Sequence, residues 1–148
     1  MNIIETVRDI IAEFPKITEL SGGVNVDFED STPGNCGLYP TGDQLLKEDI
    51  LGNQQRQHNF ILYANFNGLN EYQALANSSF LLELAYWLEK AAIGQIVEVP
   101  TKNGTLQGKL TEITSANGML YGYQNESLTG PVTYQLQIYA KYLVESEE

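Results

Sequence analysis

The first fourteen residues place apolar and polar side chains with the period of a helix. The apolar positions are Ile3, Ile4, Val7, Ile10, Ile11 and Phe14. Acidic residues line the opposite side, and Pro15 follows directly. This spacing is typical of an amphipathic helix that turns one stripe toward a core, and a proline ends such a helix. We predict a helix over this segment.

Two segments in the first half of the chain have the pattern of a long hairpin. Residues 45–51 and 54–66 flank a Gly52-Asn53 turn. The second arm alternates apolar and polar positions, which is typical of a strand buried on one face. Its apolar face carries Phe60, Leu62, Ala64 and Phe66. Residues 54–58 are polar and lie beyond that face, so we expect the hairpin tip to project from the body.

The remaining strand signals fall before this hairpin and in the C-terminal third. Residues 24–28 have the pattern of a short strand, whereas residues 29–43 are rich in Gly, Pro and Asp and predict a long loop. Four further strands are expected at residues 96–100, 106–114, 118–124 and 132–144. In the last one, Tyr134, Leu136, Ile138, Ala140 and Tyr142 fall on the inward face with Val132, and Thr133, Gln135, Gln137 and Lys141 on the outward face.

Residues 70–92 have a helical pattern with a candidate break at Asn77-Ser78-Ser79, since Asn and Ser are good N-cap residues. The elements together predict one α+β domain over residues 1–148, with an antiparallel sheet of about four long strands and two helices packed on one face. Antiparallel pairing follows from the short links, because parallel strands need longer crossovers.

The composition leaves the predicted fold unchanged but limits the kinds of partner that the chain is expected to bind. An apolar fraction of 43% and a charged fraction of 18% are typical of a globular domain. The net charge is −11, and the eight Lys and Arg residues are scattered. Tight phosphate binding needs clustered basic residues, so we expect no tight binding of nucleic acid. Apolar runs are far shorter than the ~20 residues of a membrane span, so we expect no membrane partner.

Residues able to do chemistry are sparse. The one histidine, His58, has no second His or Cys near it in sequence, so an exposed strand or tip histidine is a better interpretation than a metal ligand. Cys36 lies in a Gly-rich stretch without a partner histidine and is best interpreted as a plain thiol. In a chain this acidic, neighbouring acids such as Glu48 and Asp49 are best interpreted as solvated surface charge. We expect no metal, no cofactor and no enzyme activity.

The helix over residues 77–91 is more apolar than one sheet face requires. One stripe for the sheet is formed by Phe80, Leu81, Leu84, Trp87, Leu88 and Ala91. Leu82, Ala85 and Tyr86 remain on the flank. Either the N-terminal helix covers this flank, or a neighbouring subunit covers part of it, because large exposed apolar patches mark interaction sites.

Several of these segments, in their order, resemble one known family. Arg56-Gln57 leads into the first long strand, Asn77-Ser78 opens the helix, and Trp87-Leu88-Glu89 closes it. Paired C-terminal strands end in YQLQIYAKY. This arrangement resembles the phage minor capsid protein family of Gram-positive prophages, which is similar in turn to the tail terminator and tail-to-head joining proteins of long-tailed phages. The match spans nearly the whole chain.

The resemblance implies a structural protein of the virion that assembles in the host cytoplasm. Such relatives form a ring, typically a hexamer, at the head-proximal end of the tail tube. The ring binds the tail tube protein on one face and the head connector protein on the other. DNA passes through its lumen without specific binding, and the acidic balance of this chain fits that passage.

From exposure pattern and shape, we select six candidate residues for the subunit or partner interface: Gln54, Arg56, His58, Tyr39, Leu82 and Tyr86. Two other functions remain open at this point. A small acidic inhibitor or binding protein that mimics nucleic-acid charge would cluster its acids on one convex face. A hydrolase with paired carboxylates would need a concave pocket with two converging acids.

Overall fold

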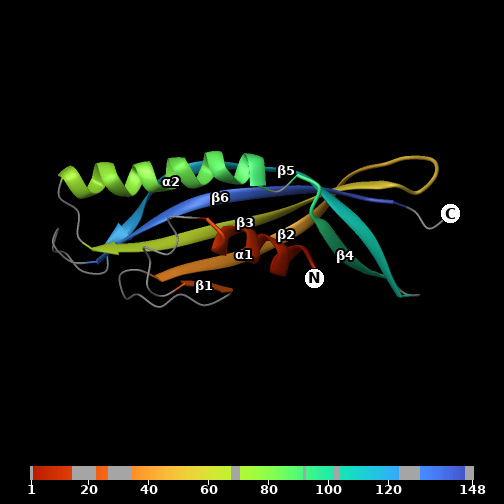
Figure 1. Ribbon diagram of the computed structural model, residues 1–148, viewed down its shortest axis with the longest axis horizontal. Helices are drawn as coiled ribbons and strands as arrows, with labels where there is room; N and C mark the ends of the chain where they lie inside the picture. The colour runs from red at the N-terminus through yellow and green to blue at the C-terminus, as the bar shows by residue number, and fades with distance from the viewer. Residues whose placement is uncertain are drawn as a thin grey trace.

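The computed structural model shows a long, curled sheet with two helices (Figure 1). The structure describes residues 2–14, 23–26, 35–67, 71–91, 93–101, 104–123 and 131–145. Across these residues the chain order is one helix, three strands, a second helix and three strands. The α+β class predicted from the sequence is therefore confirmed.

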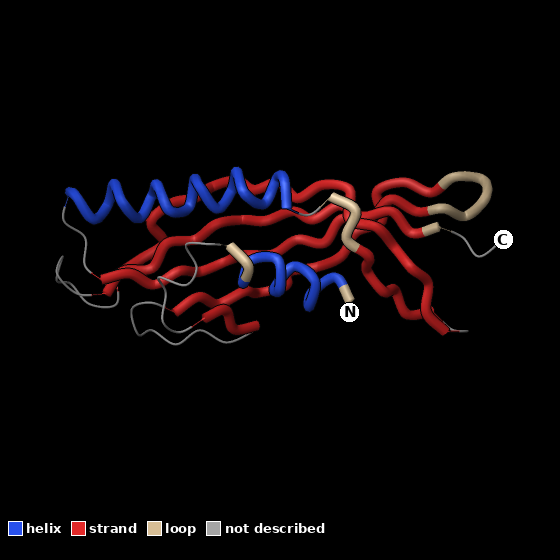
Figure 2. The backbone as a smooth tube through the Cα atoms, in the orientation of Figure 1, coloured by secondary structure: helices blue, strands red, loops and turns tan. Residues whose placement is uncertain are grey.

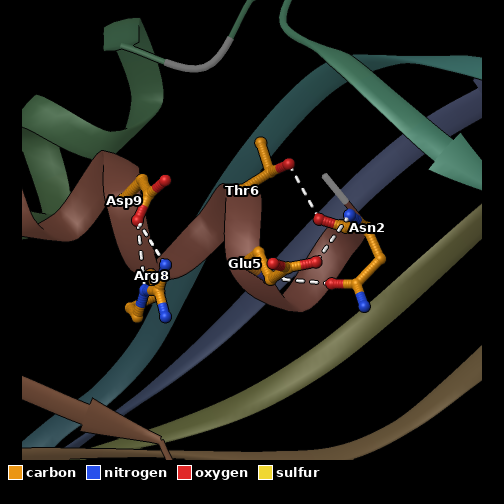
Figure 3. A network of polar contacts seen from close by, with 5 residues as sticks. All are labelled: Asn2, Glu5, Thr6, Arg8 and Asp9. Atoms are coloured by element: carbon orange, nitrogen blue, oxygen red, sulfur yellow. Dashed lines mark hydrogen bonds and ion pairs between the residues drawn. The ribbon is translucent and has the colours of Figure 1, made fainter.

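Helix α1 (Ile3–Ala12) begins at a capping box, which stabilises the first turn by satisfying backbone N–H groups. The Asn2 side chain accepts from the Glu5 N–H at 2.9 Å, and the Glu5 carboxylate accepts from the Asn2 N–H at 3.2 Å (Figure 3). The Thr6 hydroxyl donates to the Asn2 carbonyl at 2.8 Å. The predicted apolar stripe is confirmed, since Ile3, Val7, Ile10, Ile11 and Phe14 are all buried.

The six strands form one sheet in the order β1-β2-β3-β6-β5-β4. Their bounds are β1 Gly23–Val26, β2 Asn35–Glu48, β3 Gln54–Asn67, β4 Ile96–Thr101, β5 Gly104–Tyr123 and β6 Pro131–Val144. Strands β2 to β6 pair antiparallel, and the short β1 pairs parallel with β2 at the edge. The four long strands are β2, β3, β5 and β6. The short strands expected at residues 24–28 and 96–100 correspond to β1 and β4, and residues 27 and 28 lie outside the described part of the chain.

Strand β2 corrects the loop predicted over residues 29–43, because it begins at Asn35. The pairing register shifts between Pro40 and Gly42, where the strand takes an irregular step. Pro40 lies beyond Leu38, the last residue that pairs with β1, so β2 is an edge strand of the described sheet at this point, where proline is tolerated. Gly and Pro here mark a bulged edge strand rather than a loop.

Two other breaks predicted from local sequence are wrong. Helix α2 (Glu71–Ala91) runs through Asn77-Ser78-Ser79 without interruption. Asn and Ser cost up to about 0.7 kcal/mol each relative to Ala inside a helix, which packing easily outweighs. Strand β5 likewise runs through residues 115–117 with a register shift between Ala116 and Met119. A bulge absorbs the extra residues there while the strand continues.

One core joins both helices to one face of the sheet. Its fully buried side chains include Val7 and Ile11 from α1, Leu84 and Leu88 from α2, and Phe60, Leu62, Leu110, Ile113 and Ile138 from the strands. Phe14 at the end of α1 packs edge-on against Phe80 of α2 at a ring separation of 5.6 Å. Figure 2 shows both helices lying along the sheet while the β2–β3 turn extends past them.

The predicted faces of β6 are largely confirmed. Tyr134, Leu136, Ile138, Ala140 and Tyr142 are buried, and Gln135, Gln137 and Lys141 are half-buried on the other face. Thr133 is the exception, because it was expected to face outward and is only 8% exposed. It pairs with Asn65 of β3 and Gly122 of β5, so a short side chain between two strands is shielded.

Candidate interaction surfaces

Strand β3 carries three of the residues selected from sequence. Gln54, Arg56 and His58 alternate with outward positions and so continue the face that Phe60 and Leu62 present to the core. The helices do not extend over this end of the strand (Figure 1). The structure therefore brings these three side chains together on the inner face of the sheet at the base of the hairpin.

Two residues that the sequence did not single out complete this group. Asp43 pairs across the ladder with His58, and Tyr142 pairs with Arg56. The Asp43 carboxylate accepts from the Arg56 Nε at 2.6 Å and, through its second oxygen, from the Tyr142 hydroxyl. Arg56 also donates to the Gln54 side chain at 2.9 Å. Asp43 could not be selected from the sequence because it falls in the predicted loop over residues 29–43. The pairing register of β2 with β3 places it opposite His58.

His58 is buried, which corrects the exposed tip histidine expected from sequence. It is 7% exposed and stacks on Phe60 at a ring separation of 4.6 Å. Its Nδ1 lies 3.1 Å from the Asn59 carbonyl oxygen. Burial lowers the pKa of His58 below its ordinary value, and the Asn59 carbonyl and the Asp43 charge only partly oppose this. A neutral imidazole is therefore favoured in the folded chain.

The electrostatics of the group indicate a structural role. Burial, followed by the Asp43 carboxylate, raises the pKa of Tyr142 well above its ordinary value, so its hydroxyl stays a donor. Arg56 neutralises Asp43, and both carboxylate oxygens are occupied. Among the residues that the structure describes, no three His, Cys, Asp or Glu side chains gather in a way that could hold a metal ion. The group ties β2, β3 and β6 together where the hairpin leaves the body.

The β2–β3 hairpin ends in a closely bonded turn, which we call the arm tip (residues 49–53). The Asp49 carboxylate accepts from the backbone N–H of Leu51 and of Asn53, each at 2.9 Å, and from the Asn53 side chain at 3.0 Å. Gly52 adopts a φ of 87°, which glycine takes without strain. This turn projects from the body in Figure 1, as expected, whereas residues 54–58, from which the projection was predicted, stay in the sheet and pair with β6.

The arm tip exposes two aliphatic side chains that the sequence had placed in the first arm of the hairpin. Ile50 is 103% exposed and Leu51 is 69% exposed. A depression with a volume of about 420 Å³ lies at the base of the tip, lined by Lys47, Asp49, Asn53, Gln54, Gln55, Leu143, Val144 and Glu145. Its lining mixes both signs of charge with two apolar side chains, and the carboxylate of one of its two acids, Asp49, is engaged in hydrogen bonds within the turn.

Tyr39 lies on the opposite face of the sheet, in strand β2 rather than in the expected loop. It is half-buried and packs edge-on against Tyr63 at a ring separation of 5.4 Å. On the same face the Tyr139 hydroxyl donates to Gln137 at 2.8 Å. Cys36, three residues before Tyr39, is fully buried. Tyr39 therefore lies on the sheet face opposite the core, and within this stretch its side chain, unlike that of Cys36, is accessible to a partner.

The flank of α2 remains uncovered within the chain. Leu82 is 52% exposed and Tyr86 is 58% exposed, whereas Leu81 and Leu88 are buried. Helix α1 reaches α2 through Phe14, which contacts Phe80 and Trp87 on another side of the helix. Of the two explanations for the surplus apolar surface, cover by the N-terminal helix is therefore wrong.

The fold is shared with a known particle protein. A chain from the virion of a native gene transfer agent particle matches this one with a TM-score of 0.50 and 11% sequence identity. The match covers 98% of this chain and 96% of that chain. No protein-family model and no curated protein matches the sequence. In the described part of the chain, no helix is long and apolar enough to cross a membrane.

Proposed function

We propose that this protein is a structural component of a phage or phage-like particle. The observation that carries the proposal is the fold match to a virion chain over almost the full length of both proteins. The acidic chain with its scattered basic residues agrees with a role carried by surfaces.

Within such a particle, the role that we propose is a ring at the head-proximal end of the tail tube. One face of the ring binds the last ring of tail tube protein and stops further polymerisation. The other face docks on the head connector protein. The sequence resemblance to tail terminator and joining proteins supports this assignment, and a hexamer is the ring size that the resemblance implies. The protein assembles into the particle in the host cytoplasm and remains part of the virion.

Two features of the chain support a ring. A net charge of −11 repels DNA phosphate, which suits a lumen through which DNA passes without being held. Apolar side chains are exposed at several places among the described residues, including the arm tip and the flank of α2. Contacts between two different patches on successive copies are heterologous, and such contacts build rings when the rotation closes.

Removing the protein from the producing cell tests the role. A tube without its cap continues to polymerise and has no connection to the head, so we expect overlong tubes separated from DNA-filled heads in electron micrographs. Restoring the intact gene on a plasmid should restore joined particles of normal length. Tails of normal length joined to heads in the deletion strain would contradict the capping and joining role.

A further inference from the structure

The base of the β2–β3 hairpin buries a side chain that can take up a proton. His58 is 7% exposed and stacks on Phe60. The Asn59 carbonyl oxygen near its Nδ1 can only accept a hydrogen bond, so Nδ1 carries the hydrogen and Nε2 is the nitrogen that a further proton must take. The described residues give Nε2 no hydrogen-bond partner. A charge on this ring is therefore unfavourable unless a neighbour changes its own contacts.

The charged and titratable groups beside His58 come from three strands. Asp43 on β2 lies directly opposite His58 in the ladder, and Arg56 on β3 and Tyr142 on β6 follow in the next row of the same face. Strand β5 contributes a buried apolar side chain to the His58 row. On α1 the first-turn acid, Glu5, is bonded to the helix N-terminus. Among the described charges, that of Asp43 acts on His58.

The Asp43 carboxylate is already fully engaged while His58 is neutral. One oxygen accepts from the Arg56 Nε at 2.6 Å, and the other accepts from the Tyr142 hydroxyl. The charges of Asp43 and Arg56 cancel, so the group as a whole carries no net charge. A proton on His58 places a second cation beside a single carboxylate. His58 and Arg56 then compete for Asp43, because each cation is stabilised by a bond to it.

We propose that His58 and Asp43 form an acid-sensitive switch that controls how firmly the arm, residues 43–58, is held to the sheet. While His58 is neutral, Asp43 binds Arg56 and Tyr142 and ties β2, β3 and β6 together. When His58 takes a proton from water, Asp43 is drawn toward the imidazolium, its bonds to Arg56 and Tyr142 weaken, and the arm loosens. The switch belongs to the single chain and does not depend on the proposed role in a particle.

The arm is the part of the sheet that this change can release. On β2 the pairing with β1 ends at Leu38, so residues 43–48 pair with β3 alone. On β3, residues 54–58 pair with β6, and the buried apolar side chains of this strand begin at Phe60. His58 and Asp43 thus lie at the border between the arm and the covered body. Loosening at this border leaves the core in place.

The direction of the pH dependence follows from the burial of His58. In the loosened arm the ring meets water and regains its ordinary pKa of 6.5, whereas burial lowers this pKa in the closed arm. The loosened arm therefore binds the proton more readily, and its population grows as the pH falls below the ordinary pKa. Between about pH 7.0 and about pH 5.5 the opening constant of the arm should rise by up to about eightfold.

Side-chain NMR reads the switch directly, because the arginines of this chain are Arg8 and Arg56. The measurement is the rate at which each Nε–H exchanges with water. The Arg8 Nε donates to Asp9 at 3.0 Å on the surface of α1, so it serves as the internal control for the intrinsic effect of pH. The Arg56 to Arg8 rate ratio should rise severalfold from pH 7.0 to pH 5.5. In His58→Gln, which keeps a polar side chain without the charge, the ratio should stay constant.

Backbone amide exchange shows whether the arm opens by itself. After correction for intrinsic rates, the amides of residues 54–58 should have larger opening constants than core amides such as that of Ile138, and the excess should grow at pH 5.5. Equal opening constants in the arm and the core at both pH values would mean that the domain opens only as a whole. That result would overturn the switch.

Two other results would also overturn it. One is an Arg56 to Arg8 ratio that does not change with pH in the wild type. The other is a change of the same size in His58→Gln, because the proton would then act elsewhere. The wild type alone supplies the first comparison, so the test stands even if His58→Gln fails to fold. A monomeric protein gives the same readings as a ring, which keeps this test separate from that of the proposed function.

Discussion

At the scale of single residues, Asp43 is the position on which the hairpin base depends. Its carboxylate joins three strands through Arg56 and Tyr142, and the two ionic side chains are only 26% and 25% exposed. Arg56 and His58 could be selected from the sequence but their partner could not, because Asp43 lies in a stretch rich in Gly and Pro. Only the register of β2 against β3 shows that Asp43 and His58 are paired.

Removing the shared acceptor should destabilise the fold. In Asp43→Ala, Tyr142 and Arg56 lose their common partner while partly buried, and we expect the free energy of unfolding to fall by about 1.5–3 kcal/mol. Urea denaturation measures this loss. The control is Asp9→Ala, which removes the Arg8–Asp9 pair on α1, where the side chains are 41% and 40% exposed. It should cost less than about 0.5 kcal/mol. Equal losses in both variants would show that the Asp43 group adds nothing beyond a surface pair.

His58 should give the fold a dependence on pH. Its pKa in the folded chain is lowered from the ordinary 6.5 by burial, so the unfolded chain takes up the proton first as the pH falls. The stability from a neutral His58 is therefore fully present above the unfolded pKa and is lost as the pH falls through the lower folded pKa. Urea midpoints at about pH 7.5 and about pH 5.5 should differ more in the wild type than in His58→Gln. The same difference in both proteins would contradict this account.

At the scale of elements, the amphipathic patterns were reliable and the local break signals were not. The α1 stripe, the inner faces of β3 and β6, and the extent of α2 follow the periodicity of their apolar residues. The breaks expected at residues 77–79 and 115–117 rested on Asn, Ser and Gly preferences of a few tenths of a kcal/mol up to about 1 kcal/mol. Burial of several large side chains along α2 and β5 outweighs such preferences.

Helix α2 should respond differently on its two sides. Leu84 is fully buried, so Leu84→Ala removes packed atoms and leaves a cavity, with an expected loss of about 2–5 kcal/mol in the free energy of unfolding. Leu82→Ala changes a side chain that is 52% exposed, and we expect a loss below about 0.5 kcal/mol. Denaturation of the two variants at the same low protein concentration makes the comparison. A large loss from Leu82→Ala in a monomer would mean that this side chain serves the fold itself.

At the scale of the whole molecule, the sequence was sufficient for the α+β class and for the antiparallel sheet. It could not give the strand order, in which β6 lies between β3 and β5, because that order depends on contacts between distant segments. It also could not decide what covers Leu82 and Tyr86. The structure leaves both exposed in the single chain and adds Ile50 and Leu51 at the arm tip. The candidate interface is thus partly the one selected from sequence and partly new.

The mass of the purified wild-type protein tests the central claim most directly. One chain has a mass of 16.5 kDa. Native mass spectrometry, or light scattering after gel filtration, should find a closed species of defined copy number as the concentration rises, with six copies as the expected ring. A single species of 16.5 kDa at every concentration and salt tested would contradict a ring-forming structural protein.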